Sequence, residues 1–164
     1  MFQIINLKKV RKILKIIFWL IFFVYFCYML YILFLGRYRI PTTQENYNII
    51  PFKTIKMYID YYDHFNFTIW FSNLFGNVLA FMPLGFLAPL LIKRLNGFLK
   101  VLFLSFFTTV VVETIQLIYH VGGFDVDDII LNTIGGVLGY LVFLIIYTNI
   151  TNPSKGNSEF TNIR

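Results

Sequence analysis

Four apolar runs separated by short polar segments dominate the pattern of hydrophobic and polar positions along the chain. They extend over residues 13–35, 70–92, 98–119 and 129–147. Each run is about 20 residues long, which is the length that an α-helix needs to cross the hydrocarbon core of a bilayer. The pattern therefore predicts an all-α fold, a polytopic membrane helical bundle with about four transmembrane helices.

The segment from Asn48 to Tyr62 follows a different pattern, in which Ile, Phe, Met and Tyr are mixed with Lys and Asp. Pro51 favours the start of a helix, and a mixture of apolar and charged positions is typical of a helix that lies on a membrane surface. We therefore expect a short interfacial outer helix that covers a site, and the alternative is a plain connecting loop.

Composition agrees with the membrane assignment. The 164 residues are 58% hydrophobic and 20% aromatic but only 13% charged, and the mean hydropathy is +0.71. Such a composition excludes an ordinary soluble domain.

The first run is too long for the core of a signal peptide, and no small-residue cleavage site follows it, so we expect an uncleaved anchor. Residues 1–150 are expected to form one transmembrane domain, followed by a loose cytoplasmic tail over 151–164.

The net charge of +6 arises from basic residues at the ends of the apolar runs, which favours topology signals and contacts with membrane lipids over nucleic-acid binding. Basic residues form three sets. The first set lies before and at the start of the first run: Lys8, Lys9, Arg11, Lys12, Lys15. The second lies between the second and third runs, with Lys100 close by: Lys93, Arg94, Lys100; the third follows the fourth run: Lys155, Arg164. Because cytoplasmic loops are enriched in Lys and Arg, we expect both termini in the cytoplasm. Residues 120–128, which contain no Lys or Arg, and residues 36–69 are then outside, although Arg37 and Arg39 count against this orientation.

Glu113 lies inside the third apolar run, with Gln116 about one helical turn later. A carboxylate at membrane depth costs several kcal/mol, so it normally faces the protein interior or a wet cavity and marks a function. With the expected orientation, Glu113 lies roughly 9 Å below the outer end of its helix.

Polar residues of the neighbouring spans reach the same depth. Asn73 and Asn77 share one face of the second span, and Asp128 and Asn132 occupy successive turns at the start of the fourth. We therefore predict one outer-leaflet ligand-binding site, without a cofactor, a metal or an assigned catalytic residue, formed by Glu113, Gln116, Asn73, Asn77, Asp125, Asp127, Asp128 and Asn132.

Structural roles compete with this interpretation at several positions. Asn73 or Gln116 alone would more often join helices by a hydrogen bond, and Asp125 or Asp127 is expected to cap a helix. Gly122 and Gly123 permit a sharp turn between the last two spans. A face of small residues, Gly135, Gly136 and Gly139, allows close helix packing within the chain or in a homo-oligomer.

Four blocks in a fixed order carry a resemblance to the VanZ-like family: NIIPFKTI from Asn48, FSNLFGNVLAFMPLGFLAPLL from Phe71, VETIQLI from Val112, and FDVDDIILNTIGGVLGY from Phe124. The family pattern matches at Asn73, Gly76, Asn77, Pro83, Gly85, Glu113, Gln116, Asp125, Asp127, Asp128, Asn132, Gly135, Gly136 and Gly139. The resemblance implies a small protein of the bacterial plasma membrane, in a family whose founding member is associated with reduced susceptibility to the glycopeptide teicoplanin.

Three functions are consistent with these features. The first is a binding or resistance module that engages a lipid-linked cell-envelope component or the lipid tail of a lipoglycopeptide. The second is a membrane enzyme that uses Glu113 and Asp128, with His120 or a divalent cation, on a lipid-linked substrate. No recognised catalytic motif supports this enzyme. The third is a small transporter, for which four spans offer little material.

Overall fold

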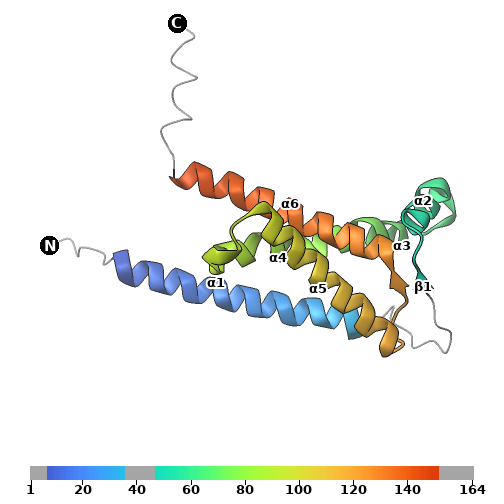
Figure 1. Ribbon diagram of the computed structural model, residues 1–164, viewed down its shortest axis with the longest axis horizontal. Helices are drawn as coiled ribbons and strands as arrows, with labels where there is room; N and C mark the ends of the chain where they lie inside the picture. Colours follow the sequence, from blue (N-terminus) through green and yellow to red (C-terminus); the bar gives the residue numbers. More distant parts are fainter. Residues whose placement is uncertain (1–6, 36–46, 152–164) are drawn as a thin grey trace, which may run out of the picture.

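The computed structural model describes residues 7–35 and 47–151 (Figure 1). Its helices are α1 Leu7–Leu30, α2 Lys53–Asp60, α3 Phe67–Phe71, α4 Asn77–Leu91, α5 Phe98–Ile118 and α6 Val126–Thr151. Shorter elements join them: the π-helical η1 Tyr31–Leu35 and η3 Ser72–Gly76, the 3-10 helices η2 Tyr62–His64 and η4 Lys93–Leu95, and the strands β1 Tyr47–Asn48 and β2 Phe124–Asp125. Arg37, Arg39, Lys155, Arg164 and the expected tail from residue 152 onward lie outside the described residues.

Four helical segments are long and apolar enough to cross a membrane: Lys9–Leu35, Phe67–Leu91, Phe98–Ile118 and Val126–Asn149. The prediction of an all-α membrane bundle with about four spans is therefore confirmed, and the expected bounds differ from the observed ones by only a few residues. The helices extend into flanking polar sequence because Lys and Arg are good helix formers and because acidic residues suit a helix N-terminus. The short helix expected after Pro51 is also present, as α2.

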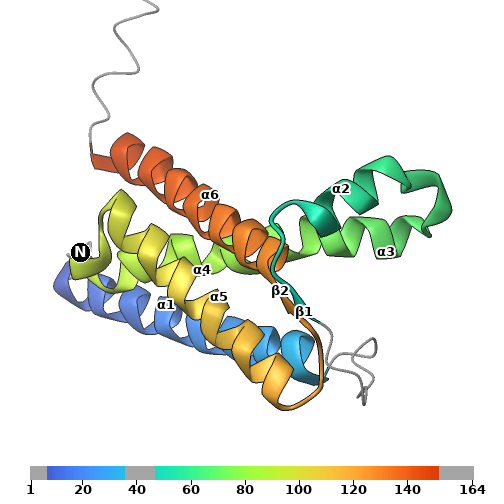
Figure 2. The same ribbon diagram turned by 45° about the vertical axis from the view of Figure 1, so that its right-hand side comes forward.

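The two ends of the bundle differ. α1 begins and α6 ends at one end, next to the connection between α4 and α5, whereas β1, β2 and α2 lie at the opposite end (Figure 1). We call these the basic end and the acidic end, because Lys93 and Arg94 lie in the α4–α5 connection and Asp125 lies in β2. At the acidic end, α2 and α3 form a hairpin beside the bundle (Figure 2).

α4 and α6 approach so closely that there is no room for a side chain at Gly85, Gly135 or Gly139. A Cβ atom added to Gly139 would lie 1.9 Å from the carbonyl oxygen of Met82, and one added to Gly135 would lie 2.2 Å from that of Val78. A Cβ on Gly85 would lie 1.8 Å from the carbonyl oxygen of Gly136. The small-residue face predicted from the sequence is therefore used within the chain, where it brings α4 and α6 into backbone contact.

The remaining helices pack around this pair. Met29 and Leu33 from the α1–η1 segment join one buried cluster with Phe81 and Leu84 of α4 and Val112 of α5. The Tyr25 hydroxyl donates a 2.7 Å hydrogen bond to the Ala80 carbonyl oxygen, which ties α1 to α4. The outward faces of the bundle are rich in exposed Ile, Leu, Val and Phe, as expected for a surface in contact with lipid tails.

Candidate functional site

A stripe of buried polar side chains follows the inward face of α5. It consists of Ser105, Thr109, Glu113 and Gln116, each no more than 2% exposed. Spacings of four and three residues keep these positions on one side of an α-helix. In a helix whose other residues are mostly apolar, the stripe leads from the middle of the bundle to its acidic end.

Glu113 is bound at the acidic end by the backbone of β2. Its Oε2 atom accepts a hydrogen bond of 3.1 Å from the Asp125 amide. The segment that returns from α5 to α6 thus crosses directly over the carboxylate. Glu113 is 2% exposed, so this carboxylate faces the interior of the protein, as expected for an ionisable residue at membrane depth.

Asp125 joins three parts of the chain through its two carboxylate oxygens. Oδ1 accepts from the Asp127 amide at 2.8 Å and from Asn48 Nδ2 at 3.0 Å. Oδ2 accepts from the Thr54 hydroxyl at 2.7 Å. The parallel pairing of β1 with β2, in which Asn48 lies opposite Asp125, produces this arrangement. The bond to the Asp127 amide caps the start of α6.

Asp127 caps a different helix. The residue before α2 is Phe52, which makes no side-chain cap and has a left-handed backbone with φ of 65°. In its place, the buried Asp127 carboxylate accepts hydrogen bonds from the amides of Phe52, Thr54 and Ile55, at 2.5, 2.7 and 3.1 Å. These are donors that a helix N-terminus leaves unsatisfied, and a carboxylate there also suits the helix dipole.

Asp128 connects α6 to the start of α4. Its Oδ1 atom accepts a 2.5 Å hydrogen bond from Asn77 Nδ2. Asn77 is the first residue of α4 and follows directly on the π-helical η3. The sequence analysis grouped these two side chains in one site, and the hydrogen bond places them in contact.

Tyr58 of α2 lies over the acidic residues. Burial raises the pKa of its hydroxyl above the ordinary value, and the negative charges of Asp128 and Asp125 raise it further. The carbonyl oxygen of Tyr58 accepts a 3.0 Å hydrogen bond from Trp70 Nε1, which holds α3 against α2. We use the name carboxylate cluster for Glu113, Asp125, Asp127 and Asp128. α2 lies against the three aspartates of this cluster.

The other predicted site residues bind elsewhere. Asn73 Nδ2 donates to the Ile69 carbonyl one turn earlier, at 2.7 Å. Gln116 Nε2 donates to the Leu33 carbonyl of η1 at 2.9 Å, and Asn132 Nδ2 donates to the Thr109 hydroxyl at 2.8 Å. Gln116 and Asn132 therefore join helices. Their second polar atoms, Gln116 Oε1 and Asn132 Oδ1, are buried without a hydrogen-bond partner in the described part of the chain.

The turn between α5 and β2 differs from the expected glycine turn. The left-handed residue is His120, with φ of 54°, whereas neither Gly122 nor Gly123 has a positive φ. His120 is exposed at this turn, and its amide donates to the Leu117 carbonyl at 3.2 Å.

Neutral groups donate hydrogen bonds to the carboxylate cluster. The donors include backbone amides, the Thr54 hydroxyl and the side-chain amides of Asn48 and Asn77. Among residues 7–35 and 47–151, no group of three His, Cys, Asp or Glu side chains is arranged to hold a metal ion. The cluster thus fixes α2 to the bundle and concentrates negative charge beneath it.

Sequence reasoning missed five polar residues of this region: Asn48, Thr54, Tyr58, Ser105 and Thr109. Ser105 and Thr109 continue the four-residue spacing that ends at Glu113, and this spacing was the available signal. Asn48 and Thr54 were the neutral hydrogen-bonding residues within the NIIPFKTI block. Their partnership with Asp125 depends on a contact between segments 71 residues or more apart.

Comparison with known proteins places the chain in a family. A family model described as VanZ/LLP1 matches residues 16–147. The curated "Protein VanZ" of Enterococcus faecium is 34% identical over 73 residues, which cover 44% of this chain and 45% of that protein. The match thus spans less than half the length of this relative. No solved structure matches the chain.

Proposed function

Because this membrane protein belongs to the VanZ/LLP1 family, we propose that it lowers susceptibility to teicoplanin-type glycopeptides by binding at the carboxylate cluster. The bound molecule is a lipid-linked component of the cell envelope or the lipid tail of the lipoglycopeptide itself. In this proposal the site is a binding module in the bacterial plasma membrane, and the chain needs no catalytic residue or cofactor.

The observation that carries this proposal is the capping of α2 by Asp127. The three amide hydrogen bonds hold a short helix over the buried acidic side chains. Large apolar side chains of the same region are exposed, among them Ile50, Phe52 and Ile59. A ligand with a polar head and a lipid tail requires such a combination, in which polar groups lie beside an apolar surface at the edge of the membrane.

The proposed orientation has the acidic end outside and both termini in the cytoplasm. Lys9, Arg11, Lys12 and Lys15 at the start of α1 lie at the same end of the bundle as the α4–α5 connection, which carries Lys93 and Arg94. Basic residues near span ends favour the cytoplasmic side. The carboxylate cluster would then lie in the outer leaflet, where lipid-linked envelope components and lipoglycopeptides are found.

Glu113 and Asp128 are the residues on which we expect binding to depend. Glu113 lies on α5 and Asp128 on α6, and the carboxylate of each accepts a hydrogen bond from a different helix or strand. The enzyme alternative would use the same two carboxylates, but no recognised catalytic motif in the sequence supports it. We therefore rank binding above catalysis, and a transporter below both.

Drug susceptibility of cells that express the protein tests this function. Wild type, Glu113→Gln and Asp128→Asn are expressed at matched membrane levels, and growth is measured with teicoplanin and with a glycopeptide that has no lipid tail. We expect protection against teicoplanin in the wild type and loss of that protection in both variants, with a smaller effect on the second drug. Gln can still accept the Asp125 hydrogen bond, so loss in Glu113→Gln reports the charge. Full protection in both variants would rule out the carboxylate cluster as the functional centre.

A further inference from the structure

A groove of about 420 Å³ opens at the basic end of the bundle, far from the carboxylate cluster. It lies between the first turns of α1 and the end of α4. Its polar lining consists of Arg11, Lys15 and Lys93, and its apolar lining consists of Leu14, Phe18, Leu90 and Leu91.

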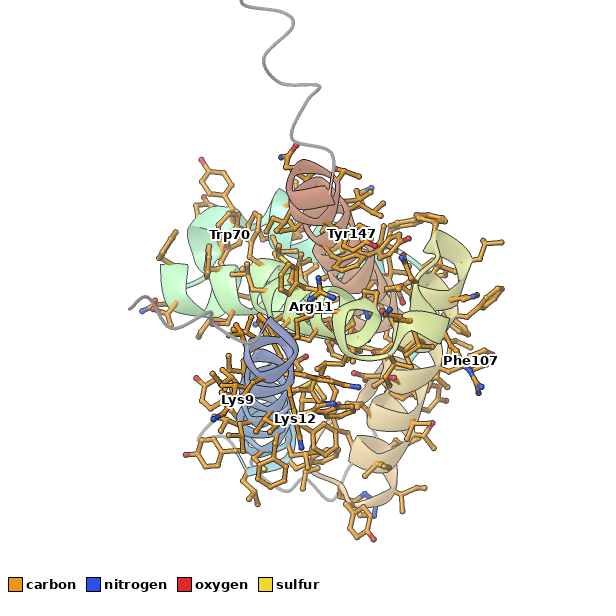
Figure 3. All side chains as sticks on the ribbon, turned by 90° about the vertical axis from the view of Figure 1, so that its left-hand side faces the viewer. Lys9, Arg11, Lys12, Trp70, Phe107 and Tyr147 are labelled. Atoms are coloured by element: carbon orange, nitrogen blue, oxygen red, sulfur yellow. The ribbon has the colours of Figure 1, made fainter. Side chains whose placement is uncertain are left out.

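The three cations converge from two elements of the fold. Arg11 and Lys15 are four residues apart, so they occupy one face of α1. Lys93 begins η4, which only Ile92 separates from the end of α4. Figure 3 looks onto this end and shows Arg11 on the side of α1 that faces α4, away from Lys9. Among the residues that the structure describes, no acidic side chain lines the groove, so no carboxylate of that part of the chain neutralises the positive charge gathered there.

The apolar lining continues the groove from its charged rim into the membrane-spanning part of the bundle. Leu14 and Phe18 follow Arg11 on the same face of α1, at spacings of three and seven residues. Leu90 and Leu91 form the facing wall at the end of α4. The order of chemistry from the rim inward, cationic and then apolar, is that of a phospholipid lying parallel to the helices.

We propose that this groove binds one anionic glycerophospholipid. Its phosphate lies among Arg11, Lys15 and Lys93, where Arg offers paired donors to phosphate oxygens, and an acyl chain lies along Leu14, Phe18 and Leu90. Lipid recognition by basic pockets between helices follows the same chemistry. The binding itself does not depend on the function of the carboxylate cluster, and with both termini in the cytoplasm the lipid belongs to the inner leaflet.

Competition between lipids on the purified full chain tests the proposal. The protein is prepared in a neutral detergent, and retention of phosphatidylglycerol and of phosphatidylcholine is measured by native mass spectrometry as each lipid is titrated. Arg11→Gln/Lys15→Gln removes two lining cations, and Lys9→Gln/Lys12→Gln removes two cations of the same helix that do not line the groove. Both variants have the same net charge, so general attraction between the protein and anionic lipid falls equally in the two.

We expect the wild type to retain phosphatidylglycerol in preference to phosphatidylcholine. The lining variant should bind phosphatidylglycerol at least about tenfold more weakly, since each basic side chain near a lipid surface contributes about fivefold. The Lys9→Gln/Lys12→Gln control should change by less than about twofold. Lys93→Gln, which alters a different element, should weaken binding by about threefold to fivefold.

Three outcomes would overturn the proposal. Equal losses in the two α1 double variants would mean that the attraction is general. Equal retention of both lipids by the wild type would mean that the groove does not distinguish an anionic head group from a zwitterionic one. Displacement of the lipid by millimolar inorganic phosphate or glycerol phosphate, at the concentration of free phosphate in cells, would identify a soluble anion as the ligand, since the acyl chain would then contribute nothing.

Discussion

Asp127 accepts a hydrogen bond from the backbone amide of Thr54, 73 residues earlier in the chain, and so performs for α2 the capping role that Phe52 does not. The bond ties the first turn of a helix outside the spans to the first turn of a spanning helix. It makes the position of α2 dependent on the acidic end of α6.

Asp127→Asn should release α2 from the bundle. Asn retains one acceptor oxygen but directs an amino group at amides that also donate, so about 2 kcal/mol of stabilisation should be lost. We expect tryptic cleavage after Lys56 to accelerate by about 30-fold, because the open form becomes correspondingly more populated. Asp60→Asn, at the exposed C-terminal end of α2, is the control and should leave the rate unchanged. A cleavage rate for Asp127→Asn equal to that of the wild type would refute the capping role.

Gly139→Ala should destabilise the contact between α4 and α6. The added Cβ would lie 1.9 Å from the Met82 carbonyl oxygen, so the helices must separate. We expect a loss of at least about 2 kcal/mol, seen as a clearly lower melting temperature in detergent. Gly76→Ala is the matched control, because its Cβ meets only Ser72 Cβ at an ordinary 3.8 Å. Its melting temperature should be unchanged or higher, since Ala favours helix.

Tyr58 should titrate above its ordinary pKa of 10.0 when α2 is in place. A raised pKa means that the docked form holds its proton while the released form ionises, so docking of α2 should weaken as the pH rises above about 10. Asp128→Asn should lower the pKa of Tyr58 only in part, because burial is the largest cause of the shift. Tyrosinate absorbance, with Tyr58→Phe subtracted, measures this. The same pKa in Asp128→Asn as in the wild type would place Tyr58 beyond the influence of Asp128.

The proposed orientation, with both termini in the cytoplasm, predicts that cysteines placed near the two ends of α5 differ in their reactivity from outside the cell. In a Cys27→Ser background, Gly123→Cys should react with an impermeant thiol reagent added to intact cells, and Asn96→Cys should react only after permeabilisation. Gly123 lies next to β2 at the acidic end and Asn96 follows η4 at the basic end. The reverse pattern would move the carboxylate cluster to the inner leaflet and remove the basis for binding an external lipoglycopeptide.

The fold could be predicted from the sequence largely because hydrophobic length is a strong signal. The four apolar runs correspond to the four candidate spans. Pro51, followed by a mixture of apolar and charged residues, correctly predicted the helix α2. The capping role of aspartate was also predictable in kind: Asp125 caps α6, as an acidic residue before an apolar helix should. The capping of α2 by Asp127 could not be predicted, because neither segment contains a local sequence signal that identifies the other as its partner.

The site could be predicted only in part, because periodicity gives the face of a residue but not its partner. Asn77 and Asp128 were expected at one depth and form a hydrogen bond. Gln116 was grouped with them, yet it donates to the Leu33 carbonyl in η1. A carbonyl near a helix end lacks the usual intrahelical donor, and hydrophobic periodicity does not show where a helix becomes π-helical. The left-handed backbone at His120 was not predicted, because the nearby Gly122 and Gly123 were the expected residues for such a conformation.

Photocrosslinking at Tyr58 tests most directly whether the carboxylate cluster binds a lipid-linked molecule. A benzophenone amino acid replaces Tyr58, or Phe107 on the exposed face of α5 as a control, and intact cells are irradiated with or without teicoplanin. We predict a lipid-linked envelope component or the drug among the adducts at residue 58, their loss in Glu113→Gln, and only bulk phospholipid at residue 107. The same phospholipid adducts at both positions, unchanged by Glu113→Gln, would contradict the account.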